Sequence, residues 1–168
     1  MASDLDHDAL ERALAGRGEH ELFPCDPALA DTAAFCAAYG FALGDSANTI
    51  IVAGKSAPPV YAACVVLATH RLDVNRCVRG RLGTRKASFA SPEETRVLTG
   101  HEIGGVTVFG LPAGLPIWVD AAVMARERII LGGGSRSWKV IAPPTILLAI
   151  EGMEVVEGLA YPVPGAVE

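Results

Sequence analysis

Residues 98–110 are Leu-Thr-Gly-His-Glu-Ile-Gly-Gly-Val-Thr-Val-Phe-Gly. This segment is the most informative part of the chain for predicting the fold. This segment puts apolar side chains into a loop that is flanked by glycines. Glycine permits tight turns and a close approach of the backbone to other groups. The loop is therefore interpreted either as a buried turn or as a binding loop with exposed N–H donors. A lone histidine such as His101 is more often structural than catalytic.

A second glycine segment lies further along the chain. Residues 128–131 are predicted to form a strand, which runs into Gly132, Gly133 and Gly134. Three successive glycines are common in flexible turns, but they also let a backbone approach a ligand and expose its N–H donors. Both interpretations stay open from this segment alone.

Hydrophobic periodicity and turn residues predict short strands mixed with short helices. Helices are predicted over residues 3–15, 32–39, 74–82, 92–99 and 144–150. Strands are predicted over residues 49–53, 60–68, 87–90, 116–119, 128–131 and 140–142, the first two as a hairpin. Since these elements do not alternate regularly, they favour a mixed α/β fold with a curved, partly barrel-like mixed sheet and flanking helices.

Length and composition indicate one domain that buries a sizeable core. The chain has 168 residues, of which 51% are hydrophobic, and a mean hydropathy of +0.34. No apolar run approaches the roughly 20 residues that a membrane helix needs. The acidic start lacks the basic and apolar regions of a signal peptide, so we expect a cytoplasmic protein that has no membrane partner.

Charge is distributed unevenly along the chain. The net charge of −5 argues against a general nucleic-acid binder, and DNA is not an expected partner. Residues 71–86, however, hold six basic residues and one acidic residue, a local excess of five positive charges. This segment is either a solvated helix face or a patch that contacts phosphates, with Arg76, Arg79 and Arg81 as the candidate ligands.

The four cysteines and four histidines show no metal-binding spacing. The cysteines form no Cys-x-x-Cys pair, and a cytoplasmic location favours reduced structural thiols. We therefore expect neither a metal site nor a cofactor.

Taken together and in order, these segments resemble the YbaK / prolyl-tRNA-synthetase-associated family. Residues 98–110 resemble the family's signature, which is Leu-Thr-Gly, a few residues, and then Gly-Gly-Val-Ser-Pro-Phe-Gly. Residues 115–120, Leu-Pro-Ile-Trp-Val-Asp, resemble the Leu-Pro-Val-Tyr-Ile-Asp that follows it, and residues 129–136 resemble the later strand and glycine turn. Residues 48–52 and 72–74 fall in the family's order. The similarity spans roughly residues 31–160.

The resemblance implies a fold and an activity. The fold is a mixed α/β structure with a curved, barrel-like sheet. The activity is hydrolysis of the ester between a wrong amino acid and the 3′ end of a tRNA, in this family mainly proline tRNA charged with cysteine or alanine. Such editing exists because a synthetase pocket discriminates a methylene by only about 10- to 200-fold. The chain would be a free-standing editing domain over residues 1–168, with a loose tail after Tyr161.

The resemblance also implies partners and site residues. The partners are the tRNA 3′ acceptor end that carries a wrong amino acid and an aminoacyl-tRNA synthetase. The expected substrate-binding residues are Gly104, Gly105, Val106, Thr107, Val108, Asp120, Gly132, Gly133 and Gly134. We expect residues 104–108 and 132–134 to line one pocket, with Asn48 at its edge, because backbone N–H groups are suitable donors to a developing oxyanion.

Several positions depart from the family's pattern. Asn48 stands where members commonly have the lysine most tied to activity, and Val108 replaces a proline. Gly132 and Lys139 stand where some members have serine and aspartate. Asn48 carries no charge, so Lys139 is a candidate for a relocated cation, and both residues are predicted to be catalytic. The alternative is a binding protein of the same fold that holds an aminoacyl-adenosine-like ligand or a protein partner without turnover.

Overall fold

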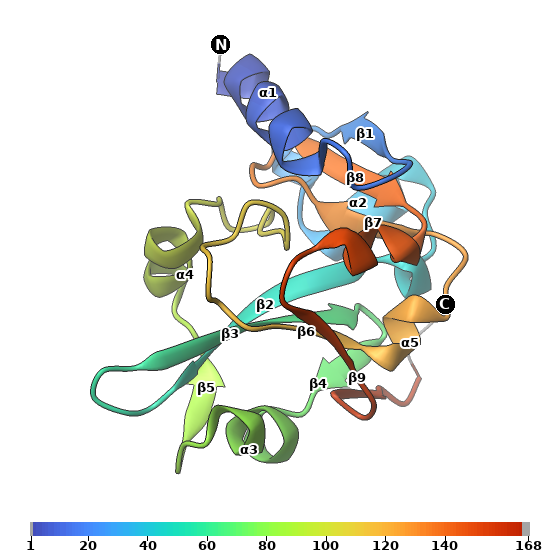
Figure 1. The fold of residues 1–168 in the computed structure, drawn as a ribbon. Helices are drawn as coiled ribbons and strands as arrows, with labels where there is room; N and C mark the ends of the chain where they lie inside the picture. The colour runs from blue at the N-terminus through green and yellow to red at the C-terminus, as the bar shows by residue number, and fades with distance from the viewer. Residues whose placement is uncertain (1, 166–168) are drawn as a thin grey trace.

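The computed structural model describes residues 2–165, with side chains from residue 7 onward, and contains three sheets and several short helices (Figure 1). A three-stranded antiparallel sheet has the order β1 (Glu21–Pro24), β8 (Trp138–Ala142), β7 (Ile129–Gly132). A five-stranded mixed sheet has the order β5 (Ala87–Phe89), β2 (Ala47–Gly54), β3 (Val60–Leu67), β6 (Ile117–Asp120), β9 (Met153–Val156). β10 (Ala160–Pro162) pairs with β4 (His70–Leu72). The mixed α/β class is confirmed, but the sheets do not close into a barrel.

The helices flank these sheets. They are α1 (Ala2–Leu14), α2 (Thr32–Tyr39), α3 (Arg79–Leu82), α4 (Pro92–Thr99) and α5 (Ala121–Met124), with the 3₁₀ helices η1 (Pro27–Leu29), η2 (Leu43–Asp45) and η4 (Pro144–Ala149) and the π-helical turn η3 (Val74–Val78). The predicted start of α4 is confirmed: Ser91 Oγ accepts from Glu94 N, and Glu94 Oε2 accepts from Ser91 N. None of the helices among the described residues has the length and apolar content needed to span a bilayer.

The five-stranded sheet is built on the predicted hairpin. β2 and β3 pair along their whole length, from Ala47 opposite Leu67 to Gly54 opposite Val60. Six successive residues of β3, 62–67, are buried, because the strand is central and covered on both faces. β6 and β9 then add in parallel. This continuous apolar run is typical of a strand that lies inside the protein.

The two larger sheets meet at the start of β2. Ser46 forms a parallel bridge with Ile130 of β7, which places the three-stranded sheet beside the five-stranded one. The main core lies between them, and Leu10 and Leu14 of α1 share it with Val108 and Phe109 of the glycine loop. The loop is therefore anchored from behind by apolar contacts and presents its other side to the junction of the sheets.

Some elements had not been predicted from the sequence. The strands β1, β4, β9 and β10 are short and pair with distant segments, and the helix α5 has only four residues. The helix predicted over residues 74–82 begins as the π-helical turn η3 and continues as α3. The tail expected after Tyr161 is hydrogen-bonded at its start, since Val163 N donates to Thr69 O.

Candidate functional site

A cavity of about 320 Å³ lies where the three-stranded sheet meets the five-stranded sheet. This volume is at the lower end of the range for small-ligand sites. Its polar lining residues are Thr32, Ser46, Asn48, Thr49, Thr95 and Lys139, and its apolar ones include Phe35, Ile50, Phe89, Ile103, Val106, Ile130 and Leu131. None of the described lining residues is a carboxylate or a histidine.

The cavity brings together residues from three distant parts of the sequence. Asn48 comes from β2, Gly104 and Val106 from the first glycine segment, and Gly132 from the second. Lys139 of β8 also lines it. Of the residues predicted to share one pocket, Asn48, Gly104, Val106 and Gly132 line this cavity and Gly105 does not. The chemical roles of all these residues stay predictions.

Other predicted site residues lie elsewhere. Val108 is buried in the main core. Thr107, Gly133 and Gly134 line a second cavity of about 210 Å³ under α1. Asp120, which is only 2% exposed, accepts a hydrogen bond from Ala160 N at the end of β6 and does not line the first cavity. These residues therefore hold the fold around the site and do not face its cavity.

The glycines are required because the two glycine segments pack backbone against backbone. A Cβ on Gly105 would lie 2.0 Å from Ser135 O, and one on Gly132 would lie 2.3 Å from Val106 O. The N–H of Gly134 donates to Gly105 O at 2.6 Å. Some of the backbone N–H groups that were expected to donate to a ligand therefore donate to carbonyl oxygens of the protein itself. The N–H groups of Gly104 and Val106 have no partner among residues 2–165, and both residues line the cavity.

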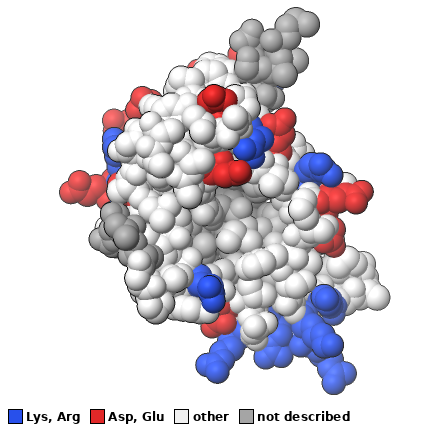
Figure 2. Space-filling view, turned by 180° about the vertical axis from the view of Figure 1, so that it is seen from behind, with Lys and Arg blue, Asp and Glu red and all other residues white. Residues whose placement is uncertain are grey.

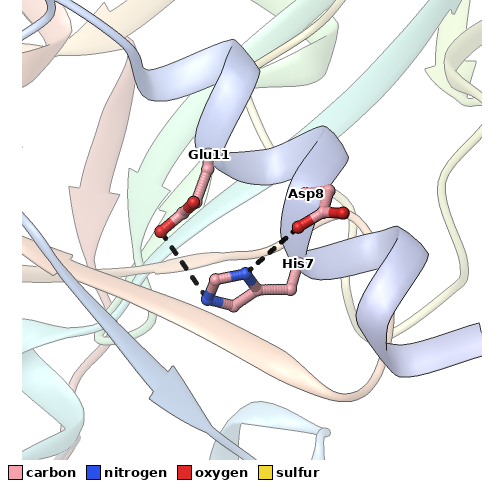
Figure 3. A group of neighbouring side chains, drawn as sticks. All are labelled: His7, Asp8 and Glu11. Carbon is pink, nitrogen blue, oxygen red and sulfur yellow. Dashed lines mark ion pairs between the residues drawn. The ribbon is translucent and has the colours of Figure 1, made fainter.

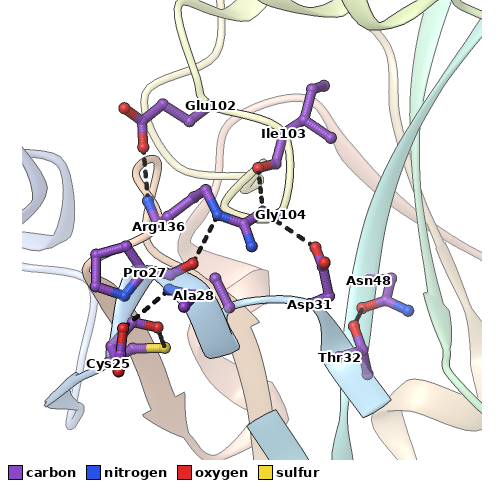
Figure 4. Close-up of polar contacts among 12 residues, drawn as sticks. Cys25, Pro27, Ala28, Asp31, Thr32, Asn48, Glu102, Ile103, Gly104 and Arg136 are labelled. Carbon is purple, nitrogen blue, oxygen red and sulfur yellow. Dashed lines mark hydrogen bonds and ion pairs between the residues drawn. The ribbon is translucent and has the colours of Figure 1, made fainter. Parts of the chain in front are cut away.

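Arg136, which was not predicted as a site residue, fastens the first glycine segment to the chain before α2 (Figure 4). Its guanidinium donates to Pro27 O at 2.8 Å, to Ile103 O at 2.8 Å and to Asp31 Oδ1 at 3.0 Å. The hydrogen bond and charge of Arg136 lower the pKa of Asp31. Asp31 is the residue before α2, but its carboxylate binds Arg136 and does not cap the helix.

Lys139 holds the same two segments from inside the cavity. Only 6% of the residue is exposed, and its Nζ donates to Ala30 O at 2.7 Å and to Gly104 O at 2.9 Å. The Nζ also lies 5.5 Å from the centroid of the Phe35 ring. Burial lowers the pKa of the Lys139 ammonium. A cation is therefore fixed at the cavity wall, bound to carbonyl oxygens.

Asn48 and Thr49 present the remaining polar groups of β2. Asn48 Oδ1 accepts a hydrogen bond from Thr32 Oγ1 at 2.9 Å (Figure 4). This bond fixes the carboxamide and leaves its NH₂ group without a partner among residues 2–165. The Oγ1 of Thr49 is buried and also lacks a partner among the described residues. Unsatisfied polar groups of this kind are uncommon in folded proteins.

The cysteines and the cluster around His7 on α1 do not line the cavity. All four cysteines are free, and burial raises the pKa of each thiol, that of Cys64 to about 12. On α1, the nitrogens of His7 lie 3.8 Å from an Asp8 oxygen and 3.7 Å from a Glu11 oxygen (Figure 3). The ring packs edge-on against Trp138 at 4.8 Å, which accounts for its orientation.

The basic segment lies away from the cavity, at the end of the molecule formed by α3 and the turn after β2. Figure 2 shows lysine and arginine side chains gathered at one end of a face whose middle is hollowed. Arg79, Arg85, Lys86 and Lys55 line a shallow depression there. Arg81 instead pairs with Glu154 and lies over the Trp118 ring at 4.9 Å.

Comparison with known proteins identifies this arrangement. The sequence model of the aminoacyl-tRNA editing domain matches residues 26–148, which contain every residue that lines the cavity. The chain belongs to this family. This assignment confirms the resemblance inferred from residues 98–136.

Two solved structures show that the editing-domain fold extends over nearly the whole chain. One is described as a candidate trans-editing enzyme for prolyl-tRNA synthetase; it is 25% identical, with a TM-score of 0.76, and the match covers 90% of this chain and 95% of that one. The other, the hypothetical protein APE2540, is 23% identical, with a TM-score of 0.79 and coverage of 91% and 99%. The second likeness concerns the fold alone.

Proposed function

We propose that this editing-domain protein is a deacylase that hydrolyses the ester between a wrong amino acid and the 3′ end of a tRNA. The observation that carries the proposal is the cavity at the sheet junction, where Asn48, Lys139 and the glycine loop meet inside the family's matched region. The solved relative described as a candidate trans-editing enzyme for prolyl-tRNA synthetase supports the same class of substrate.

The cavity suits an aminoacyl ester because it has both an apolar wall and a group of hydrogen-bonding side chains. Phe35, Ile130 and Leu131 offer an apolar wall to a small uncharged side chain. Asn48, Thr49 and Lys139 offer hydrogen-bonding groups to the ester and the ribose. None of the described lining residues is a carboxylate. The α-ammonium group of the substrate would therefore donate hydrogen bonds to hydroxyl and carbonyl oxygens.

Stabilisation of the oxyanion is assigned to the glycine loop. The N–H groups of Gly104 and Val106 lie at the cavity and have no partner among the described residues. Arg136 donates to Ile103 O, the carbonyl of the peptide unit that contains the Gly104 N–H. A hydrogen bond at one end of a peptide unit polarises it and strengthens the donor at the other end. Donors fixed in this way stabilise developing negative charge.

Lys139 contributes a fixed positive charge next to these donors. Its Nζ lies 2.9 Å from Gly104 O, so it both holds the loop and raises the local positive potential. In place of a side-chain base, the attacking water would be positioned by hydroxyl groups such as Thr49 and by the free hydroxyl of the substrate's ribose. The cation of this site thus comes from β8, and Asn48 supplies a neutral donor.

The tRNA body is proposed to approach the depression lined by Arg79, Arg85 and Lys86. Arg76 is exposed but does not line the depression, and Arg81 is already paired with Glu154. The residues proposed to contact phosphates are therefore Arg79, Arg85 and Lys86. The sequence had indicated Arg76, Arg79 and Arg81. Exposed cations such as these supply affinity for any tRNA and not specificity.

The test is a deacylation assay on a panel of tRNAs, each charged with a correct or a wrong amino acid. The proposal expects release of the amino acid from at least one mischarged tRNA at a rate proportional to protein concentration, and slower release from the correctly charged tRNA. A protein that binds these tRNAs but releases no amino acid from any of them would overturn the proposal.

A further inference from the structure

A groove of about 590 Å³ borders β5, and Phe89 lines both this groove and the cavity. The groove lies among β5, η3 and the β4–β10 pair, and it is lined by Arg71, Asn75, Phe89 and Tyr161 together with Asp73 and smaller residues. Because Phe89 lines both spaces, a chain that follows the groove arrives at the cavity mouth.

The groove gathers the exposed aromatic side chains of the described surface. Seven large hydrophobic residues are exposed among the described residues, and two of these are aromatic, Phe89 at 59% and Tyr161 at 48%. Both line this groove. A single exposed ring is unremarkable, but two rings in one groove that opens on the candidate active site form a surface for stacking.

The charge of the groove favours a polyanion. Tyr161 is directly opposite Arg71 in the β10–β4 ladder, so the two side chains share one face. Arg71 is exposed, and the basic segment that it begins continues past the groove to Lys86. The one acid in the lining, Asp73, accepts a hydrogen bond from Arg76 N and caps η3. Aromatic rings beside basic groups are the usual features of a single-stranded nucleic-acid site.

We infer that this groove holds the unpaired nucleotides at the 3′ end of the tRNA. Phe89 stacks on the last base at the cavity mouth, and Tyr161 stacks on a base further from the end, while Arg71 contacts a phosphate. The inference rests on the proposed function for the identity of the RNA. It adds a binding site outside the cavity that is independent of the depression lined by Arg79, Arg85 and Lys86.

The test measures binding of an RNA hairpin that has four unpaired nucleotides at its 3′ end, carries no amino acid and has 2-aminopurine as its last base. Stacking on Phe89 is expected to quench the probe. Phe89→Ala and Tyr161→Ala should each weaken binding about 5- to 100-fold. The quench of the last base should be lost only in Phe89→Ala. Val97→Ala is the matched control, because Val97 is 82% exposed on α4 and lines neither the groove nor the cavity.

The outcomes separate this inference from the proposed function. If both aromatic variants bind the hairpin as Val97→Ala does, the groove does not hold RNA, whatever the deacylation assay shows. The same conclusion follows if the groove binds an unstructured peptide and not the hairpin. If wild type binds the hairpin through Phe89 but deacylates no tRNA, the groove stands and the hydrolase proposal falls.

Discussion

Two groups of cations in this protein are placed in opposite ways. Arg136 and Lys139 lie at the sheet junction, where together they donate to four main-chain carbonyl oxygens and fix the glycine loop. Arg79, Arg85 and Lys86 are exposed around a shallow depression, next to the start of β5. Lys139, which is buried, and Arg136, which is partly buried, hold main-chain segments in place, and the exposed cations offer charge to a partner. The difference implies that substitutions in the first group change geometry and rate, whereas those in the second change affinity and its salt dependence.

The largest effect is expected where the two glycine segments touch. Gly105→Ala would put a methyl group against the Ser135 carbonyl, which is backbone and cannot turn aside. We expect a loss of about 2–3 kcal/mol in the free energy of unfolding, measured by chemical denaturation. Gly80→Ala on α3 is the control, because no atom lies within 4 Å of the added methyl group. Equal stabilities of the two variants would show that the close packing is not required.

The next largest effect is expected at Arg136, which acts as a clamp between the first glycine segment and the chain before α2. Arg136→Ala removes three side-chain hydrogen bonds and leaves Lys139 to link Gly104 to the segment before α2. We expect kcat to fall about 10- to 100-fold, because small displacements of positioned donors have effects of this size. Arg136→Lys should not restore it, since an ammonium group lacks the planar set of donors. A variant that moves the Gly104 amide resonance but keeps full kcat would contradict the role of the clamp.

The exposed cations should behave differently. Replacing Arg79, Arg85 and Lys86 by alanine should weaken binding to every tRNA to a similar degree. The slope of log affinity against log salt should become shallower by about 0.7–0.9 for each phosphate that the variant no longer neutralises. Arg81→Ala is the comparison, because Arg81 is occupied by Glu154 and Trp118 and should affect stability more than the slope. An unchanged slope in the triple variant would make the patch a solvated surface.

The smallest effect is a pH dependence at Asp31. Arg136 lowers the pKa of Asp31 in the folded state, so this carboxylate adds stability above its unfolded pKa of about 3.9. That contribution should disappear as the pH falls through the lower, folded-state pKa. Asp31→Asn should remove this part of the acid dependence, as measured by unfolding between pH 2 and pH 6. Identical profiles for wild type and Asp31→Asn would show that the pair contributes nothing.

The fold could be predicted from the sequence where local signals are strong. The helix over residues 92–99 and the β2–β3 hairpin are set by nearby residues, and both predictions are confirmed. β1, β9 and β10 are only three or four residues long and are held by partners far away in the sequence. Their local pattern is too short to distinguish a strand from a loop, so they were missed.

The site was predicted less completely than the fold. Glycine segments are visible in a sequence, but only Gly104, Val106 and Gly132 of the two predicted segments line the cavity with Asn48. Asp120 was assigned to the substrate, but its burial and its bond to Ala160 place it in the framework. Arg136 gave no signal, because one arginine after a glycine turn is ordinary and its three acceptors are brought together only by folding.

The most direct test of the central claim is the rate of amino-acid release by Lys139→Met, on whichever mischarged tRNA the wild type hydrolyses best. Methionine is an unbranched side chain only one atom shorter than lysine, and it removes the charge and both hydrogen bonds. Arg96→Met on the exposed face of α4 controls for the loss of a cation elsewhere, and thermal unfolding establishes that each variant is folded. The account predicts a rate about 10²- to 10³-fold below wild type for Lys139→Met and an unchanged rate for Arg96→Met. A folded Lys139→Met protein that releases the amino acid as fast as wild type would contradict it.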